Sequence, residues 1–392
     1  MKARVKIQYL YTVISIAFIL VFSFLLYYRF ELSDSLKINS GCSTFLLNKN
    51  DTVLVGHNLD ESMEVPGAIF INKRGVKKEN ISWKDFTSVS GKKSSITRIQ
   101  WISKYGSVTY NTWGKEFIDG GANENGLYIG EMTLLGTKWP KTDKPAFHHH
   151  FVMQYLLDNF ATVDEVIENM DKISIDGHCQ WHYFIADRSG RTSVVEFLNE
   201  TMKVYEGAAM PVQVLCNRAY GKELNLIPAN DSVYDQMLKN DFYEKDLRLM
   251  YASKMINEYN VNAGFPLVSY AFTMLKYMGM DNGANKWSVV CDLKNLRMWF
   301  RTSKGRDIKY IDFKSFDFSC SAPIKVFDIN TDTSGEVASQ FVDYSIKLNE
   351  QFINDNFNQI NFGFFGTLFF KGKYKNRINK YSNEFICKQA EN

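Results

Sequence analysis

The sequence predicts an α+β domain in which antiparallel strand hairpins are layered with a few helices. The first observation is three pairs of apolar, β-prone stretches, each joined by a short polar turn. They cover residues 43–49 and 51–56, 181–187 and 192–198, and 286–293 and 296–302, with a shorter buried strand expected at 212–216. The second observation is helical periodicity over residues 147–172 and 243–259.

The residues between and within these stretches support each element in chain order. The three expected turns are Asn48–Asp51, the "RSGR" sequence at 188–191 and Lys294–Asn295. In the first helical stretch, Thr162 and Glu165 form a capping-box pattern that starts a second helix. The apolar faces of the two helical stretches consist of Phe151, Tyr155 and Leu156, and of Leu247, Met250, Tyr251 and Met255.

Composition excludes several classes of protein. The chain has 392 residues, 45% of them hydrophobic, which is enough for one large domain or two ordinary ones. Its 46 Lys and Arg against 43 Asp and Glu give a net charge of +3, so we expect no nucleic-acid partner. The sequence contains neither a P-loop nor a G-x-G-x-x-G motif, and we expect no cofactor.

The N-terminal region has the pattern of a membrane segment. Residues 7–28 carry no charge and are long enough to span a bilayer. Lys2, Arg4 and Lys6 precede them, which keeps the N-terminus cytoplasmic and sends the rest across. The segment is a signal peptide or a signal anchor, and the lack of an A-x-A site after it favours the anchor. We therefore expect contact with the membrane through residues 7–28, a short pro-segment at 29–41, and an exoplasmic location for the remainder.

The C-terminal region changes pattern after Pro323. Residues 335–357 are expected to be helical, and the apolar stretch at 361–370 is too short to span a membrane. A basic stretch, "KGKYKNRINK", follows it. We expect residues 323–392 to be a helical extension packed on the domain, with contact at a membrane surface as the alternative.

Two histidine-containing segments are weak candidates for metal ligands. His148–His150 are consecutive, and consecutive positions do not face one way on a helix. His178 and His182, around Cys179, would share a face of a strand, but no second cluster in the sequence completes a tetrahedral site around them. The sequence therefore predicts no metal centre.

Cys42 has an unusual setting for a single cysteine. It follows Gly41 and directly precedes the first strand of the domain. Cleavage of the Gly41–Cys42 bond would make it the first residue, and glycine allows the unusual backbone angles that a self-cleaving bond needs. A free α-amino group has a pKa of about 7.7–8.0. It could therefore accept the thiol proton without a histidine partner.

Six segments in order resemble a known family, the N-terminal-nucleophile (Ntn) cysteine hydrolases of the choloylglycine hydrolase, penicillin V acylase and linear-amide hydrolase group. The resemblance runs from Cys42 to about Ser321. The segments are "CSTF…VLVGHNLDES" from residue 42, "GGANENGLYIGEM" at 120–132, "HYFIADRSGRTSVVEF" at 182–197, "VLCNRAY" at 214–220, "DLRLMYASKM" at 246–255 and "WSVVCDLKNLRMWFRT" at 287–302. The resemblance implies a four-layer αββα sandwich.

The resemblance also implies roles for individual residues. Cys42 would be the nucleophile, and Asp60 would hold its α-amino group. Asn217 would donate to the oxyanion, and Arg248 would lie beside the thiol and lower its pKa.

The chain departs from the family at two positions. His57 stands where the family usually has arginine, which would make thiolate stabilisation weaker or dependent on pH. A second residue near the oxyanion falls near Met132, which cannot donate a hydrogen bond, so a backbone N–H would have to serve or the role is lost.

These expectations define a function. Residues 1–28 would be the signal or anchor, 29–41 the pro-segment, 42–322 the catalytic domain and 323–392 the C-terminal extension.

The predicted activity is hydrolysis of a linear, non-peptide amide of a small molecule by Cys42. Acyl transfer to an amine on the same fold is an alternative, as is a non-catalytic, membrane-anchored domain. A lipoprotein anchored through Cys42 is disfavoured because Asn39 stands where a lipobox has an aliphatic residue. The sequence leaves the oligomeric state open.

Overall fold

The computed structural model describes residues 41–88, 98–225, 227, 248–259, 264–279, 284–360, 371–385 and 387. Within these ranges most strands belong to two large sheets. The first sheet has seven strands, in the order β14 (Val214–Leu215), β1 (Ser43–Lys49), β2 (Thr52–Asp60), β15 (Asn285–Asp292), β16 (Arg297–Thr302), β17 (Lys309–Asp312) and β19 (Gly335–Glu336). All neighbours in it are antiparallel except β17 and β19.

The second sheet has nine strands in the described residues. Their order is β13 (Thr201–Glu206), β12 (Thr192–Leu198), β11 (Trp181–Ala186), β8 (Tyr128–Thr133), β7 (Gly120–Asn123), β6 (Ser107–Asn111), β3 (Ala68–Asn72), β18 (Lys325–Asp328) and β20 (Val342–Asp343). Two small sheets are separate: β4 (Lys77–Glu79) pairs with β5 (Gln100–Ile102), and β9 (Ala146–His148) pairs in parallel with β10 (Ser174–Asp176).

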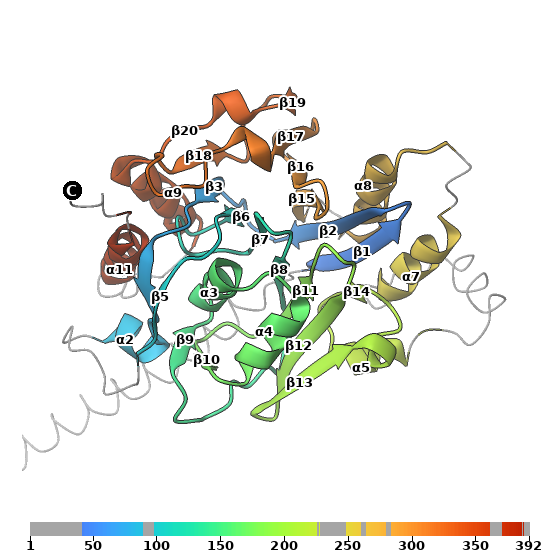
Figure 1. Ribbon diagram of the computed structural model, residues 1–392, viewed down its shortest axis with the longest axis horizontal. Coiled ribbons are helices and arrows are strands. Elements are labelled where there is room, and N and C mark those ends of the chain that lie inside the picture. The colour runs from blue at the N-terminus through green and yellow to red at the C-terminus, as the bar shows by residue number, and fades with distance from the viewer. Residues whose placement is uncertain are drawn as a thin grey trace, which may run out of the picture. The chain divides into compact units, whose positions relative to one another are not determined.

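Helices cover the outer faces of the two large sheets (Figure 1). On the first sheet, α8 (Leu267–Met278) packs against β2 and β15, and α7 (Arg248–Glu258) packs against β14. On the second sheet, α3 (Phe151–Asn159) packs against β7 and β8, and α4 (Val163–Met170) contributes to the same apolar core. A separate core, which includes Leu46, Tyr110 and Tyr128, lies where the two sheets face each other. This arrangement confirms the expected αββα layering.

The local signals in the sequence correspond to observed turns and caps. Asn50 and Asp51 join β1 to β2 with φ values of 50° and 60°, a left-handed conformation that Asn and Asp tolerate. The hairpins β11–β12 and β15–β16 also form as predicted. Thr162 and Glu165 make both hydrogen bonds of the capping box at the start of α4. Short helices complete the described fold: α2 (Trp83–Thr87), α5 (Tyr220–Leu224) and the 3₁₀ turns at Gly207–Ala209, Phe313–Ser315 and Ala338–Gln340.

The boundary expected at residue 323 is wrong. Residues 325–343 form β18, β19 and β20, which extend both large sheets. The helical part begins later, with α9 (Ile346–Gln359) followed by α11 (Gly372–Glu384). Ser345 caps α9 by accepting from the Leu348 N–H, which fixes where the helix starts. The apolar stretch 361–370 lies outside the described residues.

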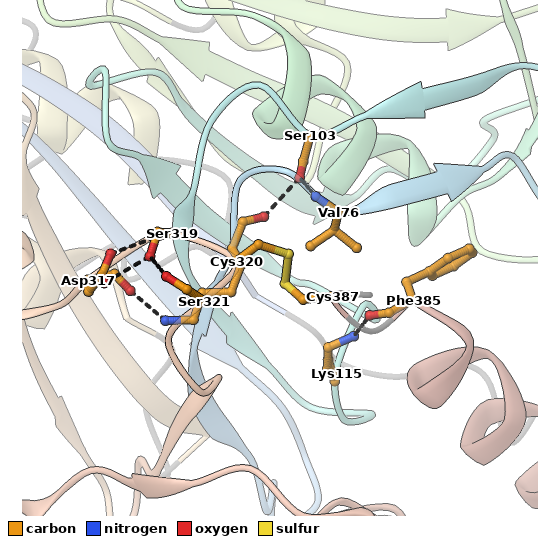
Figure 2. Close-up of a disulfide and its surroundings, with 10 residues drawn as sticks. Val76, Ser103, Lys115, Asp317, Ser319, Cys320, Ser321, Phe385 and Cys387 are labelled. Atoms are coloured by element: carbon orange, nitrogen blue, oxygen red, sulfur yellow. Dashed lines mark hydrogen bonds between the residues drawn. A yellow bond between two sulfur atoms is a disulfide. The ribbon is translucent and has the colours of Figure 1, made fainter. Parts of the chain in front are cut away.

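A disulfide joins the C-terminal region to the end of the sandwich. Figure 2 shows Cys320 bonded to Cys387, 67 residues further on. Close by, the buried Lys115 ammonium donates to the carbonyl oxygens of Ser382 and Phe385, at the end of α11. The other four cysteines, Cys42, Cys179, Cys216 and Cys291, are free thiols.

The predicted membrane segment, residues 7–28, lies outside the described residues. Among the helices that the structure does describe, none is long and apolar enough to cross a bilayer.

Candidate active site

The strand order brings the predicted site residues to one edge of the first sheet. β1 runs antiparallel to both of its neighbours, so its start lies beside the ends of β2 and β14. Cys42 directly precedes β1, Asp60 ends β2, and Asn217 follows β14 by two residues. Arg248 is the first residue of α7, which packs against β14. Residues separated by up to 206 positions in the sequence are therefore gathered here.

Arg248 holds the peptide that joins Gly41 to Cys42. Its Nη1 donates to the carbonyl oxygen of Gly41 and, at 3.2 Å, to that of Cys42. Its Nη2 donates to Asn217 Oδ1 at 2.8 Å. The planar guanidinium thus bridges the backbone on both sides of the bond and the amide of Asn217, a geometry that suits arginine's fork of donors.

The Asn217 amide is oriented from both ends. Its oxygen accepts from Arg248, and its Nδ2 donates to the carbonyl oxygen of Thr133 at 2.9 Å. Thr133 ends β8 of the second sheet, so this bond ties the two sheets together at the site. The neighbouring Met132 is fully buried in the core between the sheets, and its side chain has no donor.

Asp60 is held by a residue that the sequence reasoning missed. Asn285, at the start of β15, donates through Nδ2 to Asp60 Oδ1 at 2.8 Å. Asn285 Oδ1 in turn accepts from Ser288, whose hydroxyl also donates to Asn58. The Asp60 carboxylate lies 4.0 Å from Arg248 Nη1, and the Asp60 carbonyl accepts from the Gly41 N–H at 3.3 Å. Asn285 lies two residues before the hairpin segment 287–302 that the sequence singled out.

The Cys42 thiol is neutral in the intact chain. The side chain is 2% exposed, and burial raises its pKa well above the ordinary value. The carboxyl groups of Glu131, Glu61 and Asp60 raise it further, whereas a hydrogen bond from the Asp60 backbone opposes them. Burial also raises the pKa of Glu61 and of Asp119 to about 7, and that of Glu131 well above its usual range.

This group of carboxyls was not predicted, although part of it lay within a highlighted segment. Glu131 is in β8, in the "GLYIGEM" stretch, and Asp119 directly precedes β7. An acidic residue inside an otherwise apolar strand was the available signal. Protonated at mildly acid pH, the carboxyls repel a thiolate less than they would when ionised.

The predicted role of His57 as a pH-dependent cation beside the thiol is wrong for this chain. Residues 57–60 are part of β2 rather than a turn, and the imidazole points toward the second sheet, where it contacts the Tyr110 ring. His57 Nδ1 lies 2.7 Å from Thr44 Oγ1, and Thr44 also hydrogen-bonds the Tyr128 hydroxyl. Burial lowers the pKa of His57 to about 3, so it is neutral at neutral and mildly acid pH. It belongs to a polar chain between the sheets.

Comparison with known proteins identifies the family. The family described as linear amide C-N hydrolases, choloylglycine hydrolase family, matches residues 42–248, more than half of the chain. The chain belongs to this family, and it is therefore an enzyme of the class that hydrolyses carbon–nitrogen bonds in linear amides.

Similar proteins include some with solved structures. Penicillin V acylase from Pectobacterium atrosepticum is 24% identical over an alignment 264 residues long, and the match covers 56% of this chain and 69% of that protein. The structure of penicillin V acylase from Agrobacterium tumefaciens superimposes with a TM-score of 0.63 at 22% identity, over 78% of this chain and 98% of that one. The structure of a variant of the conjugated bile acid hydrolase from Clostridium perfringens superimposes with a TM-score of 0.59 at 19% identity, over 75% of this chain and 98% of that one. These similarities show that the sandwich is of the Ntn-hydrolase type.

Proposed function

We propose that Cys42, freed as an N-terminal residue by cleavage after Gly41, is the nucleophile that hydrolyses a linear amide. The observation that carries this proposal is that Arg248 donates to the carbonyl oxygens of Gly41 and Cys42 while it also contacts Asn217 and lies 4.0 Å from the Asp60 carboxylate. The family match, which begins at Cys42 itself, supports the same starting residue.

Cleavage begins with attack of the Cys42 thiol on the carbonyl carbon of Gly41. The carbon–nitrogen bond breaks, a thioester forms between Gly41 and the sulfur, and the Cys42 nitrogen takes up a proton as a free amine. Water then hydrolyses the thioester to the Gly41 carboxylate and the thiol. Arg248 supports this route because its Nη1 donates to the carbonyl oxygen that becomes negative.

Amide hydrolysis uses the amine that cleavage releases. The α-amino group, with a pKa of about 7.7–8.0, accepts the thiol proton, and Asp60 holds it in place. The thiolate attacks the substrate carbonyl, and the departing amine takes the proton from the α-ammonium group. Water then releases the acid from the thioester. The Asn217 amide has two N–H groups, so it can donate to the oxyanion while it holds Thr133.

The intact chain is an inactive precursor in this scheme. Its thiol is buried and protonated, and its nitrogen is part of a peptide bond, so the free α-amino group that serves as the base in amide hydrolysis does not yet exist. Cleavage replaces that neutral peptide with a group that can be positively charged, close to several carboxyls.

The substrate is proposed to be a small-molecule amide. The relatives are named penicillin V acylase and conjugated bile acid hydrolase, so penicillin V and a conjugated bile acid are the first compounds to test. Release of the amine would be followed with an amine-reactive dye.

Mass spectrometry of the intact protein tests the nucleophile. Wild type should yield a chain that begins at Cys42 and hydrolyses at least one linear amide. Cys42→Ala should remain uncut at Gly41 and inactive. Cys291→Ala, which removes a buried thiol from β15 of the same sheet, is the matched control and should still be cut. Hydrolysis at the wild-type rate by Cys42→Ala would exclude the proposal.

The enzyme is proposed to work on the exoplasmic side of a membrane. The charge pattern around residues 7–28 supports this location, as does the disulfide between Cys320 and Cys387, a bond typical of oxidising compartments. Cleavage after Gly41 would separate the domain from its anchor. Cell fractionation with an antibody to the C-terminus should therefore find the cut form released by a high-salt wash. A cut form that leaves the membrane only with detergent would contradict this maturation scheme.

A further inference from the structure

Two segments set aside as metal ligands in the sequence lie against each other in the fold. β9 and β10 pair in parallel with His148 opposite Asp176, and the His149 N–H donates to the Asp176 carbonyl at 3.0 Å. This pairing places the histidines at 148–150 beside the segment that carries His178 and Cys179. His149 and His150 do not lie within a helix, because α3 begins at Phe151. The objection that consecutive residues diverge on a helix therefore does not apply.

The ligand atoms of three residues gather within a small volume. One donor atom each from His149, His150 and Cys179 lies within 4.8 Å of the others. Tetrahedral zinc with bonds of about 2.0–2.3 Å separates its ligand atoms by about 3.3–3.8 Å. Closing the cluster thus requires side-chain movements of about 1 Å. The Sγ of Cys179 also lies 3.6 Å from Nε2 of His178, which borders the cluster.

The surroundings favour metal binding over a cluster of buried but inert histidines. Within the described residues, neither ring nitrogen of His149 nor Nδ1 of His150 has a well-formed hydrogen bond, although both side chains are buried. A buried polar atom without a partner costs about 1–3 kcal/mol. A metal ion would satisfy several such atoms at once.

Two tryptophan rings pack against the cluster. Trp181 lies 4.6 Å from His150 and 4.9 Å from His149 between ring centroids. Trp83 lies 4.6 Å from the ring of His178, which is exposed.

We propose that His149, His150 and Cys179, with His178 beside them, bind one divalent ion of the zinc type as a structural site. Imidazole and thiolate are the ligands that zinc prefers. The ion would tie the segment between β9 and α3 to the segment that leads into β11. Since β11 pairs with β8, the site would also steady the strand that carries Glu131 beside Cys42.

Cobalt substitution tests the site directly. The full chain and its Cys42→Ala variant are both used, because a free N-terminal cysteine can itself bind metals. After removal of metal with a chelator, Co²⁺ should bind with a stoichiometry of one per chain in both proteins. It should give the near-ultraviolet band of a cobalt–thiolate bond and the intense visible bands of tetrahedral cobalt. Zn²⁺ should displace it and raise the Tm.

Ligand variants in the Cys42→Ala background identify the residues. Cys179→Ser should lose the thiolate band, and His149→Ala and His150→Ala should each bind Co²⁺ more than about 10-fold more weakly. Cys291→Ser, at a buried free thiol on β15, is the matched control and should keep the full spectrum. Circular dichroism checks that each variant folds. If Cys179→Ser does not fold, the two histidine variants and the spectrum of the parent chain decide the question. A thiolate band that persists without Cys179, or no cobalt bound to the folded parent chain, would overturn the proposal.

Discussion

The contact between Arg248 and the Gly41 carbonyl predicts that the shape of the side chain, and not only its charge, controls maturation. Arg248→Lys keeps a positive charge near Asp60 but replaces two separated donor nitrogens with one. Nη1 donates hydrogen bonds to the carbonyls of Gly41 and Cys42, and Nη2 donates to Asn217. A single lysine ammonium cannot donate to both the carbonyls and Asn217.

The expected size of the effect follows from the hydrogen bond that lysine gives up. A hydrogen bond to a charged group contributes about 1.5–3 kcal/mol. A barrier change of about 1.36 kcal/mol alters a rate tenfold. If the bond to Gly41 is retained in the transition state and lysine loses it, cleavage after Gly41 should slow by about 10- to 150-fold.

The assay is a time course of freshly translated precursor, followed by intact mass so that cut and uncut chains are counted directly. Arg297→Lys is the matched control, since Arg297 also makes a two-pronged contact, to Asp312, on the same sheet. It should be cut at the wild-type rate. A wild-type rate for Arg248→Lys, with Arg248→Gln strongly slowed, would mean that charge alone matters and would refute the geometric argument.

Three further predictions follow from the burial of charged groups and from the disulfide. The folded chain holds the Glu61 proton more tightly than the unfolded chain, with a pKa of about 7 against 4.5, so this group's contribution to stability is full below pH 4.5 and is lost as pH rises through 7. The free energy of unfolding of Glu61→Gln, relative to that of wild type, should therefore rise by up to about 3 kcal/mol between pH 4.5 and pH 8. Urea unfolding at both pH values measures this gain, and an equal difference at both would contradict it. Burial lowers the pKa of His57 to about 3, against 6.5 in the unfolded chain. The contribution of His57 to stability is therefore full above pH 6.5 and is lost as pH falls toward 3, because the unfolded chain binds the proton more readily. His57→Gln should leave the pH profile of kcat/KM between pH 5 and 8 unchanged while making the fold more resistant to acid; a profile that shifts would show that His57 titrates at the site. Replacing both Cys320 and Cys387 by serine opens a loop of 67 residues and should cost about 4 kcal/mol. If thermal unfolding shows that the free energy of unfolding falls by less than about 1 kcal/mol, the C-terminal helices stay packed on the domain without the disulfide.

Part of the site could be predicted from the sequence. The position of Cys42 before a strand follows from the local pattern, whereas the resemblance to the hydrolase family implied roles for Asp60, Asn217 and Arg248. Arg248 was expected to act on the thiol, whereas the intact chain uses it to hold the carbonyls of Gly41 and Cys42. That difference depends on where α7 begins relative to β14, which no local pattern specifies.

The residues that the sequence missed are those brought in by strand order. Asn285 reaches Asp60 only because β15 pairs with β2, across more than two hundred residues. Glu131 acts on Cys42, and Asp119 on Glu131, only because the second sheet packs on the first. His57 was misjudged because β2 continues through it, which turns the side chain toward Tyr110 in the second sheet.

The sequence by itself determined the hairpins and the capped helix α4, because alternation, turn residues and caps act over a few positions. The tertiary structure alone decided which distant groups share one space. It paired β9 with β10 and so joined His149 and His150 to Cys179, although each segment was unconvincing when considered separately. The physical reason is that side-chain periodicity is a local property, whereas strand order and the packing of sheets are set by burial of the whole chain.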